Sequence, residues 1–365
     1  MTTQVAPRLD PAIFRLPVER IREGYYSDAY FVYTKELLEA EDRHPRVTMQ
    51  VFQKQHSVLG GVDEAVAVLK TCSGRRGGAD GEWIPGWGEL EVHALHEGDR
   101  IAPWETVMTI EGDYALFAHL ETVYLGCMAR RSLIMRNVSE VVEAAGGKPI
   151  FYFPARHDHW LVQTGDGWSA HVAGAIGVST DAQASWWGGR GTGTVPHGLI
   201  AAYGGDTVAA ARVFADRFHR EMNITVLVDF TNDSVETALA VAEALGSKLW
   251  GVRLDTSEQL IDRSLFGAMG GFTPTGVNPR LVEKVRHALD AAGFEGVRIV
   301  ASGGFNAQRI REFESAGVPV DAYGVGSSLI RGRNDFTADV VLLEGRPCAK
   351  VGRSYRPNLR LERVD

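Results

Sequence analysis

Short apolar runs alternate with helical stretches through the second half of the chain, and this pattern constrains the fold more than any other feature. Between residues 149 and 327 the strand candidates are PIFYFPA, GTVPHGLI, ITVLVDF, LWGVRLD, VRIVAS and DAYGVGS. Stretches such as SVETALAVAEALG and NPRLVEKVRHALDAAG lie between several of them and have helical character. Such alternation predicts a parallel sheet with crossover helices. Six or seven strands favour a β/α barrel over a Rossmann sheet.

The first third of the chain has a different pattern. Residues 46–59 alternate as a strand does, and residues 62–70 are typical of a helix. Residues 89–95 and 106–112 follow as a strand–turn–strand pattern around the EGD turn. This order predicts a small α/β sandwich domain.

We therefore expect two domains. The α/β sandwich occupies residues 1–115 and is joined by the strand-like tail, residues 340–365. The irregular β/α barrel occupies residues 116–339, and the helical stretch 115–146 could bridge the two domains.

Composition excludes several classes of partner. Of 365 residues, 38 are basic and 46 acidic, so the net charge of −8 argues against a general affinity for nucleic acid or for anionic membranes. No apolar run approaches the roughly 18 residues that span a bilayer, and the N-terminus lacks the apolar segment of a signal peptide. The three cysteines are far apart without a CxxC pair, which suits a reducing compartment. A cytoplasmic protein is expected.

In a β/α barrel, functional side chains lie at the C-terminal ends of the strands. Polar side chains follow the strand candidates here, and they could line one cavity: Arg156, His197, Asp229, Arg253, Asp255 and Ser302.

The last two strand candidates end in glycine-rich turns, SGGFN and GVGSS. Barrels often bind phosphate at the loops after their final strands, where glycine lets backbone N–H groups approach the phosphate oxygens. The residues concerned are Ser302, Gly303, Gly304, Gly324, Gly326 and Ser327. Since many βα turns contain glycine for conformational reasons alone, both explanations are open.

The other candidates also have an alternative explanation. His197 could be a core histidine rather than a residue of the site. Asp229 and Asp255 could hold Mg²⁺ or a sugar hydroxyl, or could cap the following helices. Arg253 lies within an apolar strand, where an unpaired charge is costly, so it should meet an acid or an anionic ligand.

Seven segments in order, from about residue 24 to 360, resemble nicotinate phosphoribosyltransferase, a member of the type II phosphoribosyltransferase superfamily. They are YYSDAYF, EGDRIAPWETVMTIEGDYALFAHLET, FPAR, GTVPHGLIAAYGGD, GVRLDTSEQ, SGGFN and GVGSS. The chain departs from the family pattern at Trp104, Thr106, Pro154 and the Ser257-Glu258 pair, and its length suits a compact branch. The resemblance implies an N-terminal α/β sandwich, an incomplete barrel, and synthesis of nicotinate mononucleotide and pyrophosphate from nicotinate and phosphoribosyl pyrophosphate.

The resemblance also implies roles for individual residues. Phe153 and Tyr30 would sandwich the pyridine ring, with Tyr30 supplied by a neighbouring subunit of an obligate dimer or larger homo-oligomer. Arg156 and Arg253 would bind the anionic groups. The two glycine turns would hold the 5′-phosphate.

The remaining roles concern the reaction itself. Asp229 and Asp255 would lie near the ribose, with Asp255 near Mg²⁺. His197 would be phosphorylated transiently by ATP, which would couple ATP hydrolysis to synthesis.

Substrate choice rests on Ser179 in GVST. The nicotinamide enzymes have an Asp at the matching position, and a carboxylate there would repel nicotinate, whereas Ser would not. Nicotinate is therefore expected, with nicotinamide and quinolinate as alternatives. A non-catalytic phosphate-ligand binder and a different sugar-phosphate enzyme are the alternatives outside this reaction.

Overall fold

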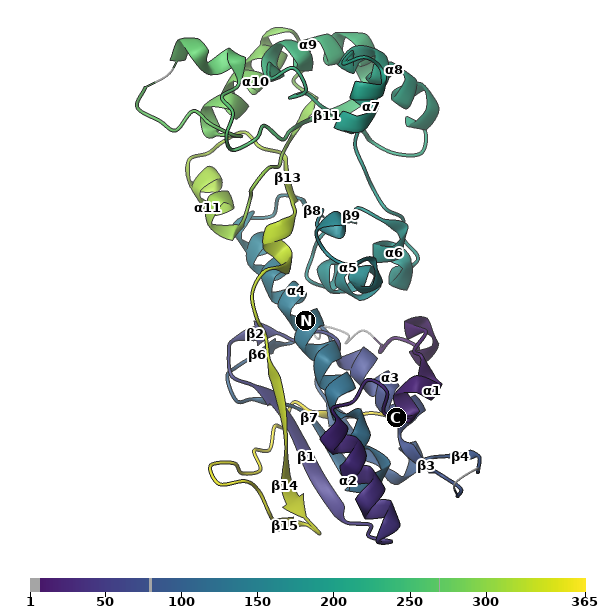
Figure 1. Ribbon diagram of the computed structural model, residues 1–365. Helices are drawn as coiled ribbons and strands as arrows, with labels where there is room; N and C mark the ends of the chain where they lie inside the picture. Colours follow the sequence, from purple (N-terminus) through teal and green to yellow (C-terminus); the bar gives the residue numbers. More distant parts are fainter. Residues whose placement is uncertain (1–6, 79–80, 269) are drawn as a thin grey trace. The chain divides into compact units, whose positions relative to one another are not determined.

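The computed structural model describes residues 7–78, 81–268 and 270–365, which form two compact units. Unit 1 comprises Met1–Arg136 and Gly332–Asp365, and unit 2 comprises Asn137–Arg331 (Figure 1). An antiparallel sheet with helices forms unit 1, and a curled parallel sheet with helices forms unit 2. The predicted fold class is confirmed. Among the described helices, none has both the length and the apolar character that a bilayer crossing requires.

The units divide at other positions than residues 115 and 339, where the sequence placed the boundaries. The first part of α4 (Glu121–Ala144) belongs to unit 1, because Tyr124 and Met128 are fully buried in its core. Near the second boundary, Phe336 at the start of β14 belongs to the same core.

Unit 1 is built on a six-stranded sheet in which every neighbouring pair is antiparallel. Its spatial order is β15 (Arg346–Pro347), β14 (Phe336–Leu343), β1 (Arg46–Gln53), β7 (Thr106–Asp113), β5 (Glu91–Ala94) and β16 (Glu362–Arg363). Two short pairs add β2 (Ser57–Val58) with β6 (Arg100–Ile101), and β3 (Gly74–Arg76) with β4 (Trp83–Pro85). The helices are α1 (Val18–Arg22), α2 (Ala29–Ala40), α3 (Val62–Cys72) and the first part of α4.

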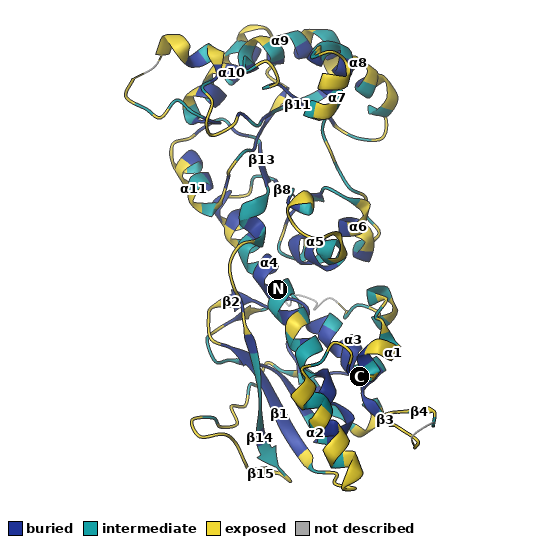
Figure 2. Cartoon of the chain, in the orientation of Figure 1, coloured by how far each residue is buried: buried dark blue, intermediate teal, exposed yellow. Residues whose placement is uncertain are grey.

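The central strand β1 is buried on both faces (Figure 2). Val47, Met49 and Val51 alternate along it and share the core with apolar side chains of α3 and α4. On the other face, Gln50 accepts the N–H of Arg356 at 2.7 Å. The basic tail therefore covers this face of the sheet, within the unit that contains β1.

The EGD turn caps helix α3. Gly61, the N-cap residue, has no side chain to offer. The Glu97 carboxylate accepts the N–H groups of Gly61 and Asp63, both at 3.1 Å. This residue, distant in the sequence, therefore supplies the missing cap.

Asp28 and Thr122 join the YYSDAYF segment to the start of α4. The Thr122 hydroxyl accepts the N–H of Asp28 and donates to Asp28 Oδ2, each at 2.9 Å. This pair fixes the beginning of α2, the helix that carries Tyr30.

Unit 2 is built on a six-stranded sheet in which every neighbouring pair is parallel. Its order is β10 (Ile224–Leu227), β11 (Leu249–Leu254), β12 (Arg298–Ala301), β13 (Ala322–Val325), β8 (Ile150–Tyr152) and β9 (Gly177–Val178). The helices are α5 (Gln163–Val172), α6 (Asp181–Ala184), α7 (His197–Ala202), α8 (Thr207–Phe218), α9 (Ser234–Leu245), α10 (Pro279–Ala291) and α11 (Ala307–Ser315), with 3₁₀ turns between some elements.

One predicted strand is wrong. In GTVPHGLI only Val195 makes a bridge, to Val226, and α7 begins at His197. Pro196 precedes that helix and has no N–H for a strand ladder. The segment still helps to curl the sheet, because Thr192 donates its N–H to Val178 of β9 while Val195 donates to Thr225 of β10.

The helices that follow β10 and β11 have caps of their own. Asp233 accepts from Glu236 N–H at the start of α9, and Asn278 accepts from Leu281 N–H at the start of α10. Asp229 and Asp255 therefore do not act as N-caps, which leaves their carboxylates for the strand ends.

Candidate functional site

Arg253, Asp255 and Ser302 form a closed ring of hydrogen bonds at the ends of β11 and β12. Arg253 Nε donates to Ser302 Oγ at 2.8 Å, and Arg253 Nη2 donates to Asp255 Oδ2 at 3.2 Å. Ser302 Oγ lies 2.8 Å from Asp255 Oδ1 and 2.9 Å from the Leu254 carbonyl oxygen, so its proton has two acceptors. Arg253, which was predicted to meet an acid or an anionic ligand, is paired with Asp255. The side chains of Arg253 and Asp255 both remain partly exposed.

His197 and Asp229 form a second pair at the same end of the sheet. His197 Nε2 donates to Asp229 Oδ1 at 2.8 Å, and this hydrogen bond raises the pKa of His197. The charges of Asp255 and Arg253 also act on its pKa, in opposite directions. The structure thus brings together all four side chains predicted for catalysis. His197 is not a core histidine, because 44% of its side chain is exposed.

Both glycines of the 302–304 turn have left-handed backbone conformations, with φ of 85° at Gly303 and 71° at Gly304. Arg309 supports this turn from α11, because Nη1 donates to the Gly303 carbonyl at 2.9 Å. Glu258 forms an ion pair with Arg309 at 3.6 Å, and a side chain on Gly304 would overlap the Glu258 carboxylate. Arg309 was missed in the sequence, although a cation at the third position of the next helix could have indicated it.

Gly324 and Gly326 make room for side chains from the loop after β8. A Cβ on Gly324 would lie 2.8 Å from the Phe153 ring, and one on Gly326 would lie 3.2 Å from His157 Cε1. The guanidinium of Arg253 lies over the Phe153 ring, 5.1 Å from its centroid. The absence of a side chain at Gly324 therefore allows Phe153 to lie beneath Arg253.

Three further predicted residues lie at the ends of strands in unit 2. Ser179 follows β9, and its hydroxyl donates to the Tyr152 carbonyl at 3.3 Å. Arg156 is exposed in the 3₁₀ turn after β8. Ser327 begins the turn after β13 and is half-buried.

Tyr30 belongs to unit 1. It lies on α2 with 60% of its surface exposed. Tyr33 and Leu37 are also exposed, and they follow Tyr30 on α2 at helical spacing. These three residues form an exposed stripe on α2.

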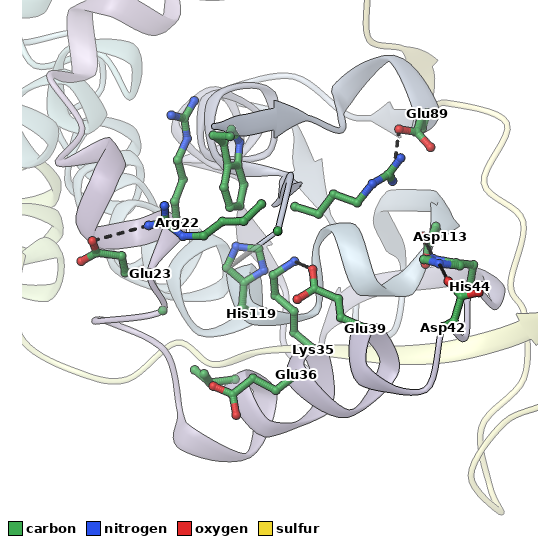
Figure 3. Close-up of a pocket in the computed structure, with 16 residues that line it drawn as sticks. Arg22, Glu23, Lys35, Glu36, Glu39, Asp42, His44, Glu89, Asp113 and His119 are labelled. Atoms are coloured by element: carbon green, nitrogen blue, oxygen red, sulfur yellow. Dashed lines mark hydrogen bonds and ion pairs between the residues drawn. The ribbon is translucent and has the colours of Figure 1, made fainter. Parts of the chain in front are cut away.

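A cavity of about 640 Å³ lies in unit 2 beside the 302–304 turn. Glu258, Asn306 and Arg309 are among the residues that line it. A different cavity, of about 880 Å³, lies in unit 1 (Figure 3). Lys35 and His119 lie next to each other there, and burial lowers the pKa of His119 to about 3, so its imidazole is neutral. Within the described residues, the lining of the unit 1 cavity includes none of the side chains predicted for the site.

Asp255 and Asp229 could hold a magnesium ion only together with phosphate oxygens of a bound substrate. Across the described ranges, no three His, Cys, Asp or Glu side chains are grouped to hold a metal. Mg²⁺ commonly uses one or two carboxylates together with phosphate oxygens of a substrate. Asp255 and Asp229 fit that donor set.

A family model described as quinolinate phosphoribosyl transferase, N-terminal domain, matches residues 28–132. Nicotinate phosphoribosyltransferase pncB1 of Mycobacterium tuberculosis is 31% identical over 260 residues, which are 70% of this chain and 52% of that protein. The nicotinate phosphoribosyltransferase of Bacillus subtilis is 23% identical over 244 residues, which are 65% of this chain and 45% of that protein. The chain therefore spans about half the length of the curated relatives it matches.

Solved structures match over more of the chain. The crystal structure of nicotinate-nucleotide pyrophosphorylase from Pyrococcus furiosus is 32% identical, with a TM-score of 0.77 over 98% of this chain and 82% of that one. Human nicotinic acid phosphoribosyltransferase has a TM-score of 0.69 over 90% of this chain and 77% of that one, at 17% identity, and indicates the fold alone.

Proposed function

Because the chain belongs to the type II phosphoribosyltransferases, in the group that contains the nicotinate phosphoribosyltransferases, we propose that it makes nicotinate mononucleotide for NAD biosynthesis. The pyridine nitrogen of nicotinate would attack C1 of phosphoribosyl pyrophosphate and displace pyrophosphate. The observation that carries the proposal is the ring of Arg253, Asp255 and Ser302, which directly adjoins a glycine turn with left-handed backbone.

The reaction needs positive charge where the pyrophosphate leaves. As the bond from C1 to the pyrophosphate oxygen breaks, positive charge develops on the ribose and negative charge on the leaving group. Arg253 is held in place by Asp255 and Ser302, so little reorganisation is required when the negative charge develops. Arg156 is exposed in the turn after β8, a strand of the same parallel sheet, and would supply a second cation.

The aromatic ring of Phe153 supports the pyridine site. Its position beneath Arg253 puts an apolar face next to a cation. Nicotinate combines an aromatic ring with a carboxylate, so this pairing suits both parts of the substrate. Ser179, at the neighbouring strand end, brings a hydroxyl rather than a carboxylate.

Magnesium would be held by Asp255, with Asp229 close by, together with phosphate oxygens of the substrate. When bound, it would neutralise charge on the pyrophosphate. The carboxylate of Asp255 already balances Arg253 across 3.2 Å, so its orientation is set before any ligand arrives.

We further propose that His197 accepts a phosphoryl group from ATP. Its Nε2–H is used by Asp229, which leaves Nδ1 as the nitrogen with a lone pair in the neutral ring. Asp229 has only 8% of its side chain exposed and keeps the imidazole in this tautomer. Hydrolysis of the phosphohistidine would couple ATP use to synthesis.

Quinolinate is the second candidate substrate, because the matching family model describes a quinolinate phosphoribosyltransferase domain. Quinolinate carries two carboxylates and should need more positive charge around the ring than nicotinate does. The proposed pyridine site holds Arg253 over Phe153 and an exposed Arg156, which favours the singly charged acid.

The decisive experiment measures pyrophosphate release from phosphoribosyl pyrophosphate and Mg²⁺. Nicotinate, nicotinamide and quinolinate are tested in parallel, each with and without ATP. We expect release with nicotinate that ATP stimulates, and loss of the stimulation with some synthesis left in His197→Ala. Release with quinolinate alone would replace the proposed substrate, and inertness towards all three would remove the proposed reaction.

A further inference from the structure

The buried hydroxyl of Ser302 joins the glycine turn to the two charged residues of the proposed site. Ser302 is only 2% exposed, so its side chain is not available to a ligand in solution. Its backbone N–H donates to the Leu254 carbonyl at 2.9 Å and continues the pairing of β12 with β11. Its Cα is therefore fixed by the sheet, and the hydroxyl points back to β11.

We propose that Ser302 is a positioning residue that aims Arg253 and Asp255 at the pyrophosphate end of the substrate. Sequence reasoning gave Ser302 a different task, that of a phosphate ligand. The hydrogen bonds assign its hydroxyl to Arg253 Nε and to Asp255 Oδ1, each at 2.8 Å. This inference rests on the proposed phosphoribosyl transfer and adds a role that the reaction itself does not specify.

The geometry explains why a hydroxyl is needed at this position. The oxygen accepts from the cation and its proton can be donated to the anion, so one atom satisfies both members of the pair. The Arg253 side chain has about four rotatable bonds before its guanidinium, and the guanidinium lies over the Phe153 ring. The bond from Nε to Ser302 selects one rotamer among the several that Phe153 would permit.

The same residue also connects two subsites. Gly303 and Gly304 follow Ser302 directly and have the left-handed backbone expected of a phosphate-binding turn. A phosphate that orders this turn would also order the hydroxyl one residue away. The bound 5′-phosphate would thereby help to align Arg253 with the leaving group.

The test compares binding of two fragments of the substrate. Isothermal titration calorimetry with the full chain measures affinity for ribose 5-phosphate and for magnesium pyrophosphate. Ser302→Ala should weaken pyrophosphate binding about tenfold or more and change ribose 5-phosphate binding less than about threefold. Turnover, kcat, should fall more than KM rises.

Two further variants separate positioning from folding. Ser302→Cys nearly conserves shape but has a weak acceptor, so it should show the same selective loss even if the alanine variant folds poorly. Ser169→Ala is the matched control, because its equally buried hydroxyl donates to the Gly165 carbonyl within α5 and contacts neither charged residue. It should bind both fragments as the unaltered chain does.

Each remaining outcome has a defined meaning. If Ser302→Cys weakens the binding of both fragments equally and lowers the melting temperature, Ser302 is merely structural, and the inference is overturned. Unchanged pyrophosphate binding in both Ser302 variants would overturn it as well. If the unaltered chain binds neither fragment, the proposed function fails, and the inference that rests on it fails for that separate reason.

Discussion

His197 Nε2 and Asp229 Oδ1 lie 2.8 Å apart, and the carboxylate raises the pKa of the imidazole above its usual value near 6.5. A protonated imidazole has no lone pair and cannot accept a phosphoryl group. The proposed coupling to ATP should therefore decline as the pH falls through this raised pKa, and should be complete above it.

Asp229→Asn should move that decline to lower pH. The amide can still accept the hydrogen bond, but it lacks the charge that favours the imidazolium, so the pKa of His197 falls. We expect the midpoint of ATP stimulation to move to lower pH, with a lower maximum because the tautomer is less well defined. Pyrophosphate release measured from pH 5.5 to 8.5 gives the midpoint.

Asp233→Asn is the matched control for this experiment. Asp233 caps α9, a task that Asn performs equally well, and its charge is not among those that shift the pKa of His197. Its midpoint should equal that of the unaltered chain. A midpoint for Asp229→Asn that stays in place or rises would contradict the assignment.

Gly324→Ala tests whether the room at this glycine is needed by Phe153. The backbone at Gly324 is not in the left-handed region, so an added Cβ acts only through contact, at 2.8 Å from the ring. We expect the KM for nicotinate to rise about tenfold and unfolding to become easier by about 1–3 kcal/mol.

A control variant and a double variant test whether Gly324→Ala acts through the Phe153 ring. Gly296→Ala adds a Cβ that meets open space and should change neither quantity. In the double variant Gly324→Ala with Phe153→Ala, the alanine at position 324 should change KM and stability less than it does alone. The reason is that the Phe153 ring, which its Cβ would meet, is absent. Additive effects would show that Gly324 acts independently of Phe153.

The alternation of strands and helices predicted the second unit well. Buried parallel strands are continuous apolar runs, so β10, β11 and β12 were visible in the sequence. The two-residue strand β9 gave no run to detect, and Val195 makes only a single bridge. Strands this short are defined by their neighbours rather than by their own residues.

The sequence placed the candidate side chains at strand ends but did not predict the hydrogen bonds between them. It predicted that Arg253 would meet an acid or an anionic ligand, and in the structure Asp255, two residues further on, is that acid. Ser302 lies 49 residues from Arg253 in the sequence, and their hydrogen bond depends on the register of β11 against β12. The need of Gly324 for space likewise depends on where the Phe153 ring lies.

Lys35→Met should destabilise unit 1. Lys35 Nζ donates to the carbonyls of Gly74 and Ala115, both at 2.8 Å, and to Glu39 at 2.7 Å. Methionine leaves two buried carbonyls without this donor, which should cost about 2–4 kcal/mol. Urea denaturation measures the loss. Lys70→Met, whose ammonium lies over the Trp87 ring, should change stability by less than about 1 kcal/mol.

Glu121→Gln should make stability less dependent on pH. Burial, with the nearby charges of Asp339 and Asp28, raises the pKa of Glu121 to about 8. A raised carboxyl pKa means that the folded state holds the proton more tightly. Its stabilising contribution is complete below the unfolded pKa near 4.5 and is lost as the pH rises through 8.

The glutamine variant lacks this titration. It should be more stable than the unaltered chain at pH 8.5, by on the order of 1–2 kcal/mol after allowing for partial exposure, and the difference should vanish near pH 5. Urea denaturation at both pH values measures it. The exposed Glu41→Gln serves as control. A difference that is the same at both pH values would contradict the assignment.

The exposed stripe of Tyr30, Tyr33 and Leu37 on α2 leads to a prediction about assembly. If Tyr30 completes the pyridine site of a neighbouring subunit, Tyr30→Ala and Arg253→Ala impair the site from different chains. A mixed dimer then contains one site with both residues intact and one site with neither. Random mixing makes half of the dimers mixed, so about a quarter of the activity should return.

Mixing Arg253→Ala with Asp255→Asn provides the matched control. Both residues belong to one ring of hydrogen bonds within unit 2, so every site in a mixed dimer lacks one of them and no activity should return. The two mixtures are refolded together and assayed for pyrophosphate release at equal concentration. If activity returns in neither mixture, Tyr30 belongs to the site of its own chain or to no site. The exposed stripe on α2 would then have a different binding partner.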